Sequence, residues 1–433
     1  MLEKTKVNSF YVILSGLFKF DVSKISKQAL FDTYQPWQTR VNGGDYEATF
    51  NYLSTTYYDA YLSNIFPEIH NEKYNQKDLN PEFLNHLTNS KVAEQSLSFE
   101  LRINAEKVVL CNMDFIDLYL FPFGLGLFSI KVMLNSADLN LGDISDLTNR
   151  MRQLQSVIKL EGVEQTISSF VEAEILKPLN LENDWYGYNP QLKSYIMIDL
   201  ADSISEQEMN YLLYDIGNVS PLGSAKGDGV LSPSEYYFNE QMQNNKLSVF
   251  KNWSAIALFD TFTRISINHD DLFKSWEYDF FQIYIHTLHI KFFMYLTNTR
   301  VSDVTSITKE TEEIRDDFIE FVNDYNQSHI SYKFLPDLIQ DKLLNALEIE
   351  SEVNMMETKI ARINEHAQEI REKRMNLVLL VITFLGVFSM IYDVSSWFVD
   401  MGVDRSIVYP RLSIVVVLTV LVLITVTFRV FKK

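Results

Sequence analysis

Three groups of residues in this 433-residue chain have types and spacings that could do chemistry. The segment Gly223-Ser-Ala-Lys-Gly-Asp-Gly229 has the glycines and the lysine of a phosphate-binding loop, but it lacks the Gly-Lys-Ser/Thr order that surrounds phosphates. His286 and His289 are three residues apart and could ligate a metal, yet no carboxylate or third histidine is spaced to complete the site. The single cysteine, Cys111, lies in an apolar run without an activating base. We therefore expect a surface loop, no metal site, a buried thiol and no catalysis.

The composition indicates a compact, acidic domain in a reducing compartment. Hydrophobic residues make up 47% of the chain and aromatic residues 13%, which is more than a disordered chain carries. A lone cysteine cannot form a disulfide framework. The formal net charge of −19 repels nucleic acid and anionic lipid, so we expect no direct binding of nucleic acid. The same charge would attract cations, or it would only keep a crowded oligomer soluble.

Two apolar runs close to the C-terminus predict transmembrane helices. Residues 375–392 contain no charged side chain in 18 positions, which is close to the thickness of the hydrocarbon core. Residues 412–428 are dense in Val, Ile and Leu, and basic residues follow them. We predict a first span, an external loop and a second span at 375–398, 399–410 and 411–431.

The residues that flank the two runs predict that both termini are cytoplasmic. Basic residues cluster before the first run and after the second, and positive charge of this kind stays on the cytoplasmic side of a membrane. The N-terminal sequence has no apolar core long enough for a signal peptide, so we expect the preceding domain to remain in the cytoplasm. The basic flanks are Arg371, Lys373, Arg374, Arg429, Lys432 and Lys433.

The sequence before the first run has the heptad pattern of a helix that associates with copies of itself. Apolar residues recur there at alternating spacings of four and three, and no proline or glycine occurs between Asp337 and Leu385. We predict one continuous stalk helix over 338–398, with its oligomer contact along this seam. The alternative is that the helix packs only on its own domain. The seam consists of Ile349, Val353, Met356, Ile360, Ile363, Ala367 and Ile370.

Strand patterns occur in the first two thirds of the chain. Two apolar, β-branched stretches at 107–121 and 125–134 are joined by Pro122-Phe-Gly124, a turn sequence, which predicts a hairpin. We expect further strands at 195–200 and 253–262, although the second of these could be a helix.

Helical patterns complete the cytoplasmic part. Apolar residues at helical spacing predict amphipathic helices at 143–158, 273–295 and 310–325. The fold class that these elements predict is α+β or α/β, with a ligand-sensing domain at 1–270 and a helical segment with the stalk at 271–374.

The order of these parts resembles the CorA family of divalent-cation channels, in which a cytoplasmic α/β domain, a very long helix, a short external loop and a second span follow one another. The segment Phe384-Leu-Gly-Val-Phe-Ser-Met-Ile-Tyr392 resembles the stretch that leads into the family's Tyr-Gly-Met-Asn signature. Here Asp393-Val-Ser395 follows the tyrosine, so Gly-Met-Asn is replaced. The asparagine ring of the family holds a hydrated divalent ion, whereas this chain offers the Asp393 carboxylate and the Ser395 hydroxyl.

A CorA-like chain without this signature is similar to the membrane effectors encoded beside type III CRISPR systems. In those effectors a cytoplasmic domain is thought to sense a messenger built from S-adenosylmethionine and AMP, here termed SAM-AMP. The resemblance implies a homo-oligomer, a pentamer, in the bacterial inner membrane, which a small nucleotide ligand opens in antiviral defence without a cofactor. The alternatives are a divergent divalent metal-ion transporter of the magnesium type and a membrane-tethered scaffold that does not conduct.

The resemblance implies a site for an adenine-containing ligand in the cytoplasmic domain. Aromatic rings would stack on the base, and basic groups would bind the phosphate. Each residue that could do so could instead be structural. The candidates are Trp185, Tyr186, Tyr188, Arg152 and Lys131.

A second set of candidates concerns the pore. Asn376, Thr383 and Met390 are seven residues apart, so they share one stripe of a supercoiled helix, and the two polar ones would lack partners in lipid. We expect this stripe, together with Asp393 and Ser395, to line the pore. The alternative is that Asn376 and Thr383 form hydrogen bonds to the second span.

Overall fold

The computed structural model divides the chain into two compact units, Met1–Met356 and Glu357–Lys433, and each is described by itself. The first unit holds a large sheet and its covering helices, and the second holds most of one very long helix. The described residues are 4–21, 25, 37–40, 46–75, 79–134, 140–177, 184–227, 232–269, 273–303, 309–402, 406–407, 410, 413–417 and 419–420.

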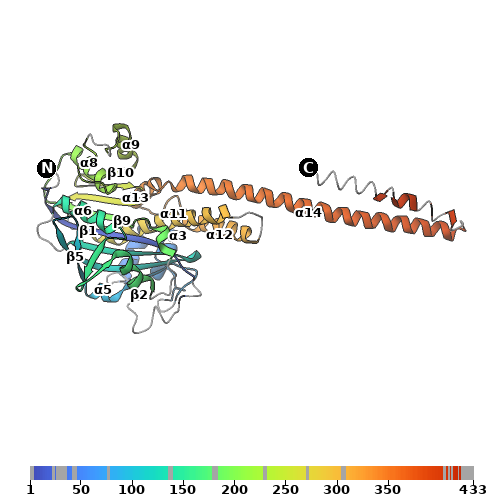
Figure 1. Cartoon of the computed structure of the whole chain (residues 1–433), viewed down its shortest axis with the longest axis horizontal. Coiled ribbons are helices and arrows are strands. Elements are labelled where there is room, and N and C mark those ends of the chain that lie inside the picture. The colour runs from blue at the N-terminus through green and yellow to red at the C-terminus, as the bar shows by residue number, and fades with distance from the viewer. Residues whose placement is uncertain are drawn as a thin grey trace. The chain divides into compact units, whose positions relative to one another are not determined.

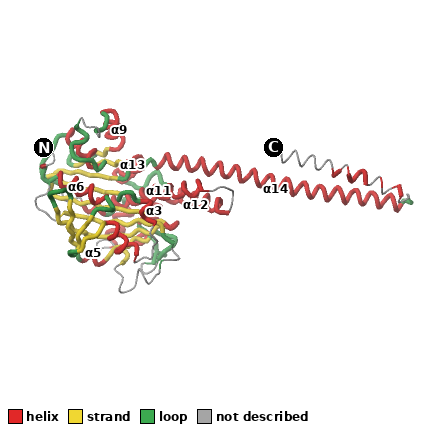
Figure 2. The backbone as a smooth tube through the Cα atoms, in the orientation of Figure 1, coloured by secondary structure: helices red, strands yellow, loops and turns green. Residues whose placement is uncertain are grey.

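The first unit is built on a mixed sheet of twelve described strands, drawn in yellow in Figure 2. These are β1 Val7–Lys19, β2 Trp37–Thr39, β3 Asn85–Asn89, β4 Leu97–Arg102, β5 Val108–Phe121, β6 Leu125–Leu134, β7 Val157–Leu160, β8 Val163–Thr166, β9 Lys193–Leu200, β10 Lys246–Leu247, β11 Trp253–Leu258 and β12 Thr261–Ile267. Their order is β10-β11-β12-β9-β1-β6-β5-β4-β7-β8, and β3 joins β2 to β5. Described neighbours are antiparallel except β12 and β9, which are parallel.

Helices connect and cover the strands (Figure 1). Short helical turns occur at Glu172–Leu176 and Asp184–Tyr188. The described α-helices are α2 Tyr46–Ser54, α3 Asp59–Ile65, α4 Pro67–His70, α5 Ser90–Glu94, α6 Leu141–Arg152, α7 Ile167–Val171, α8 Glu206–Gly217, α9 Glu235–Asn245, α10 Phe273–Glu277, α11 Asp279–Asp303, α12 Lys309–Tyr325, α13 Phe334–Ala346 and α14 Ile349–Asp400.

Both faces of the central strands are buried, because side chains alternate between two layers of helices. On one face Val12 of β1 and Phe128 of β6 belong to a core that includes Leu147 of α6. On the other face the ring of Tyr195 in β9 lies 5.1 Å from that of Phe281 in α11, measured between centroids. The sheet is therefore the middle layer of an α+β unit, as the sequence predicts.

The predicted hairpin is confirmed as β5 and β6, which pair from Cys111 and Leu134 to Phe121 and Leu125. Its turn needs a glycine, because Gly124 has a φ of 71° and a Cβ there would lie 2.5 Å from the carbonyl oxygen of Phe20. The expected burial of Cys111 is confirmed as well, and burial raises the pKa of its thiol to about 12.

Two other expectations are confirmed in part. The strand expected at 195–200 is β9, and the helix expected at 310–325 is α12. The helix expected at 273–295 occurs as α10 and α11, which are separated at Tyr278.

Two predicted elements are wrong in extent. The strand or helix expected at 253–262 is two antiparallel strands, β11 and β12, joined by a turn in which Phe259 has a φ of 48°. The helix expected at 143–158 ends at Arg152, and strand β7 begins at Val157 because the chain there pairs with β4 and β8. Apolar residues at 154 and 158 had continued the helical pattern past its end.

The stalk is not the single helix that the sequence predicts. Helix α13 ends at Ala346, and α14 begins at Ile349 after a break in which Glu348 has a φ of 54°. Leu347 and Ile349 are both buried, and the break at Glu348 allows both side chains to reach the core. Neither glycine nor proline marks this position, so the pattern of residues carries no sign of it.

Helix α14 is the one described helix long and apolar enough to cross a membrane. It has 52 residues, and its most apolar window of 18 residues has a mean hydropathy of 2.3 with no part of it buried. The first predicted span lies within it. The second predicted span, 411–431, falls largely outside the described residues, of which 413–417 and 419–420 are helical.

Packing in the sheet gives a test of stability. Gly16 of β1 faces Phe128 of β6, and a Cβ at Gly16 would lie 2.2 Å from that buried ring. We expect Gly16→Ala to lower the free energy of unfolding of the first unit by about 2 kcal/mol, because overpacking a close-packed core costs this much. Denaturant titration followed by tryptophan fluorescence measures it.

Gly187→Ala is the control for this measurement, because no atom lies within 4 Å of a Cβ at that position. Its free energy of unfolding should stay close to that of the wild type. Equal losses in the two variants would contradict the overpacking argument.

Candidate functional site

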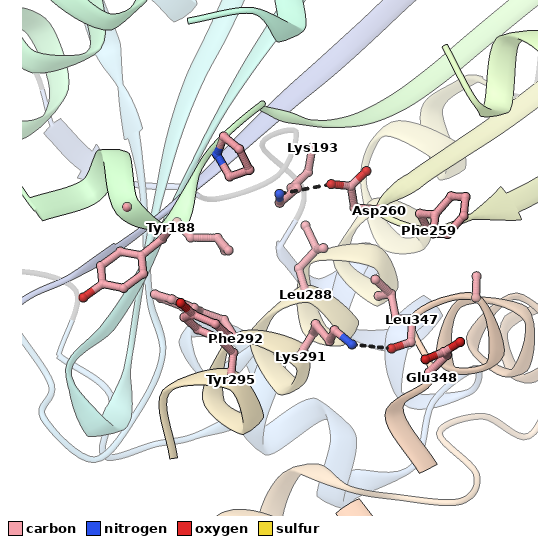
Figure 3. Close-up of a pocket in the computed structure, with 14 residues that line it drawn as sticks. Tyr188, Lys193, Phe259, Asp260, Leu288, Lys291, Phe292, Tyr295, Leu347 and Glu348 are labelled. Carbon is pink, nitrogen blue, oxygen red and sulfur yellow. Dashed lines mark hydrogen bonds and ion pairs between the residues drawn. The ribbon is translucent and has the colours of Figure 1, made fainter. Parts of the chain in front are cut away.

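A pocket of about 540 Å³ lies in the first unit, beside α11 and the junction between α13 and α14 (Figure 3). Its walls come from the ends of β1 and β9, the turns before β9 and β12, helix α11 and the residues that lead into α14. The lining residues are Leu17, Gly187, Tyr188, Pro190, Lys193, Phe259, Asp260, Leu288, Lys291, Phe292, Tyr295, Ala346, Leu347 and Glu348.

Aromatic side chains form one wall of the pocket. Leu288, Phe292 and Tyr295 follow one another at helical spacing, so α11 presents them on one stripe. The ring of Tyr188 meets that of Phe292 edge to face at 5.3 Å and that of Tyr295 at 6.4 Å between centroids. Such a wall can pack against the ring of a bound ligand.

One end of the pocket has an excess of positive charge. The Asp260 carboxylate pairs with Nζ of Lys193 at 3.0 Å and with Nη2 of Arg152 at 2.9 Å. The turn that carries Asp260 is held by the Tyr284 hydroxyl, which donates to the Asp260 carbonyl oxygen at 2.6 Å. Burial, followed by the nearby Asp260 charge, raises the pKa of Tyr284 well above its usual value. Two cations thus share one carboxylate at this end.

The other end, at the α13–α14 junction, has an excess of negative charge. Lys291 donates from Nζ to the Leu347 carbonyl oxygen at 2.8 Å and pairs with Oε1 of Glu352 at 2.6 Å. Glu348 lines the pocket beside them and is exposed. Among the described residues no cation lies within ion-pair distance of Glu348, so one cation faces two carboxylates here.

Two of the five ligand residues expected from the sequence belong to this region. Tyr188 lines the pocket directly. Arg152 lies behind it, where it donates to the Leu192 carbonyl oxygen at 2.9 Å and to Oγ1 of Thr261 at 3.0 Å besides its pair with Asp260. Arg152 therefore sets the charge and position of Asp260 rather than lining the pocket.

The other three expected residues do not join them. Trp185 is 1% exposed and belongs to the core on the opposite face of the sheet from α11. Tyr186 packs on Trp185, with ring centroids 4.7 Å apart. Lys131 is occupied by two carboxylates, those of Asp114 and Glu277, each at 2.7 Å. These three have structural environments outside the pocket.

Sequence reasoning missed the pocket residues of α11 and β9. Lys291, Phe292 and Tyr295 lie in the segment that the sequence identifies only as an amphipathic helix, and Lys193 lies two residues before the expected strand at 195–200. A lysine and a tyrosine at i and i+4 at the end of a long apolar run are the one signal that could have indicated them.

The glycine-rich segment at 223–229 uses its backbone amides within the protein. The amides of Gly223 and Ala225 donate to the Asp215 carboxylate at 2.7 and 2.8 Å. Burial raises the pKa of Asp215 to about 6 despite these bonds. The described part of the segment, which ends at residue 227, thus binds the protein's own carboxylate rather than offering its amides to a phosphate.

His286 and His289 are core residues in an aromatic cluster. His289 stacks on Phe121 with ring centroids 3.7 Å apart, and His286 meets Tyr61 edge to face at 5.5 Å. Burial lowers the pKa of His286 to about 4 and that of His289 well below its usual value. Among the described residues no group of three His, Cys, Asp or Glu side chains could hold a metal ion.

In the second unit, the apolar part of α14 is exposed on every face except one stripe, so exposure alone does not distinguish the expected pore residues. Asn376, Thr383 and Met390 are exposed, and so is Asp393. The Thr383 hydroxyl donates to the Leu379 carbonyl oxygen at 2.8 Å, so the argument that this threonine would lack a partner in lipid is wrong. The one less exposed stripe contains Leu380, Phe384, Phe388, Ile391, Ser395 and Val399.

Ser395 thus lies on the partly covered stripe, apart from the other expected pore residues. Its hydroxyl donates to the Tyr392 carbonyl oxygen at 2.8 Å. The same partial exposure occurs at Val416, Thr419 and Val420, which share one face of the following helical segment.

The heptad seam is divided between two environments. Ile349, Val353 and Met356 are buried within the first unit, with exposed fractions of 1%, 6% and 0%. Ile363 and Ile370 are partly exposed. The N-terminal part of the seam is therefore used by the chain's own fold, which is the alternative that the sequence left open for the whole stalk.

Two comparisons of this chain with known proteins gave no match. No protein-family model matches it. A search of curated proteins finds no significant match. The pocket and the long apolar helix are the features of the described residues that bear on function.

The buried histidine gives a prediction about pH. Because the pKa of His286 is lowered to about 4, the unfolded chain binds more protons than the folded chain between that pH and about 6.5. Stability therefore rises with pH across this window and is lost on acidification, by about 3 kcal/mol for a single histidine. We expect His286→Leu to flatten this part of the curve of melting temperature against pH.

His366→Leu is the matched control, because His366 lies on α14 with a side chain that is 65% exposed. Its curve should follow that of the wild type. An unchanged slope in His286→Leu would show that His286 is not held neutral in the core.

Proposed function

We propose that this protein is an oligomeric membrane channel of CorA-like architecture that a nucleotide messenger of the SAM-AMP type opens, disrupting the membrane in antiviral defence. The observation that carries the proposal is the position of the pocket. Residues that lead into α14 form one of its walls, and α14 is long and apolar enough to cross a membrane. A ligand in the pocket would therefore touch the base of the membrane helix.

The pocket fits a small organic ligand better than an ion. Its volume of about 540 Å³ lies in the range of ligand sites, about 300–1,000 Å³. Tyr188, Phe292 and Tyr295 supply rings, and Lys193 and Lys291 supply cationic groups for a phosphate. This combination favours a ligand that has both a ring system and charge.

The proposed topology has two membrane spans, of which α14 supplies the first. At 1.5 Å per residue its 52 residues measure about 78 Å, more than twice the hydrocarbon thickness of about 30 Å. The basic residues at both ends of the apolar region favour two spans with cytoplasmic termini in the bacterial inner membrane. The N-terminal half of α14 would then stand in the cytoplasm.

Association of copies would bring the α14 helices together. Ile363, Ala367 and Ile370 continue the heptad seam beyond the part that the first unit buries, and they are partly exposed. The exposed stripe of Asn376, Thr383 and Met390 would then line the axis. A ring of Asp393 carboxylates near the membrane surface would attract cations without the asparagine ring that selects magnesium in the CorA family.

A flux experiment tests the proposal directly. The purified chain in liposomes of bacterial lipid should release a trapped dye or cations when SAM-AMP is added, and S-adenosylmethionine or AMP alone should have little effect. Tyr188→Ala should raise the required messenger concentration about tenfold, because stacking on an aromatic ring contributes about 1–3 kcal/mol per base. Magnesium uptake that is independent of any nucleotide would instead favour the transporter alternative.

The pore stripe generates a prediction of its own. In nucleotide-triggered bilayer recordings we expect Thr383→Leu to lower the conductance several-fold while the oligomer stays intact, because an apolar constriction excludes water. Ile382→Leu, one position away on α14, is the control and should conduct normally. Unchanged conductance together with weakened assembly in Thr383→Leu would mean that this stripe faces a neighbouring helix.

The exposed part of the seam predicts the oligomer. We expect the double variant Ile363→Asp, Ile370→Asp to dissociate in detergent, because each unpaired charge buried along a helix contact costs several kcal/mol. Mass measurement of the complex checks this, and Thr358→Asp, at an exposed position of α14, is the control. A monomeric wild type would end the stalk argument.

A further inference from the structure

The charges around the pocket are separated into two ends. At the β9 end, Lys193 and Arg152 share the single carboxylate of Asp260. At the α14 end, Lys291 faces the carboxylates of Glu348 and Glu352. Figure 3 shows Lys193 with Asp260 on one side of Leu288 and Lys291 with Glu348 on the other. A ligand that spans the pocket thus meets an excess of positive charge at one end and of negative charge at the other.

Lys193 and Lys291 each have an ion-pair partner within the protein, and Glu348 differs from them in this respect. Lys193 has Asp260 at 3.0 Å, and Lys291 has both the Leu347 carbonyl oxygen and Glu352. For Glu348, no cation of the described residues lies within ion-pair distance. The carboxylate that lacks a counter-charge in the lining is therefore the one at the junction.

Glu348 also occupies a strained position. Its φ of 54° is the left-handed region, which a residue with a side chain rarely adopts. It joins α13 to α14 between Leu347 and Ile349, which are 6% and 1% exposed, so burial on both sides holds it there. Strained residues that their surroundings hold in place occur often at switch regions.

We propose that the pocket selects ligands that carry an anionic group and a cationic group on either side of a ring system, with the cation paired to Glu348. The anionic group lies at the Lys193 end, and the ring packs on Tyr188, Phe292 and Tyr295. The cation supplies the counter-charge that Glu348 lacks. A ligand that carries only an anionic group leaves Glu348 without a counter-charge. It also adds negative charge to a pocket whose α13–α14 end is already negative.

This inference has a consequence for regulation, and that part rests on the proposed function. The ligand's cation binds the residue that connects α13 to α14, so occupancy acts on the backbone where the membrane helix begins. The bound state and the empty state then differ in whether a counter-charge lies beside the strained residue. Selection of the ligand, in contrast, requires no conduction.

A pair of probes that differ in one charge tests the selection. SAM-AMP has a sulfonium cation, which is the cation assigned to Glu348, and the analogue made from S-adenosylhomocysteine has a neutral thioether at the same position. Both compounds keep the α-ammonium and α-carboxylate groups, so only the charge at sulfur differs. Titration calorimetry with the full-length protein in detergent should show about fivefold tighter binding of the sulfonium compound, the effect of a partly exposed ion pair of about 1 kcal/mol. In Glu348→Gln the two compounds should bind equally, at the affinity of the thioether in the wild type.

Glu350→Gln is the matched control, because Glu350 is exposed in the first turn of α14 and does not line the pocket. It should keep the preference for the sulfonium compound. Lys193→Gln should weaken both compounds by a similar factor, since both carry the phosphate. Melting temperatures close to that of the wild type verify that each variant folds.

The outcomes separate this inference from the proposed function. Binding of both compounds without a sulfonium preference, or a preference that persists in Glu348→Gln, overturns the role of Glu348 and leaves the nucleotide-gated channel standing. A preference that depends on Glu348 in a protein whose liposomes stay sealed supports the selection and overturns the channel. If neither compound binds the wild type, both proposals are wrong.

Discussion

Every residue from Phe281 to Ile290 of α11 is buried, so this part of the helix has no face in contact with water. One side packs on the sheet, where Phe281 meets Tyr195, and other sides pack on α12 and α13. Burying a large apolar side chain contributes about 1.5–3 kcal/mol. Because α11 buries apolar side chains on all its sides, it holds the sheet, α12 and α13 together. The pocket lies beside the end of this enclosed part, where Lys291 is partly exposed and Tyr295 is exposed between residues that are still buried.

The sequence predicts an element correctly where the hydrophobic pattern and the turn-forming residues agree. The prediction fails where packing sets the backbone geometry. The hairpin of β5 and β6 is predictable because a proline and a glycine separate two apolar runs. The turn between β11 and β12 depends on Phe259 in a left-handed conformation, and the break before α14 depends on Glu348 in the same region. Both residue types are poor signals for such turns, since only the burial of their neighbours holds them there.

The candidate site is less predictable than the fold, for a related reason. The expectation that aromatic rings stack on an adenine base led to Tyr188, but the same reasoning also led to Trp185, which is a core residue beneath the sheet. Arg152 is paired with the carboxylate of Asp260, and Lys131 is paired with two carboxylates. Whether a basic residue is available to a ligand depends on its ion pairs, and these join segments more than a hundred residues apart, as between Arg152 and Asp260.

Energy scales limit how a ligand in this pocket can act on α14. Burial of Ile349, Val353 and Met356 ties the first turns of the helix to the first unit, and three such side chains contribute about 5–9 kcal/mol together. An ion pair at Glu348 contributes about 1 kcal/mol, so it cannot detach the helix. It can shift an equilibrium between two arrangements of a strained junction about fivefold in each chain. In an oligomer these shifts multiply when all copies change together, and five copies would change the population about a thousandfold or more. A weak contact at Glu348 would therefore suffice for the proposed gating only if the α14 helices move as one assembly, so the proposed switch needs the exposed part of the seam as much as the pocket.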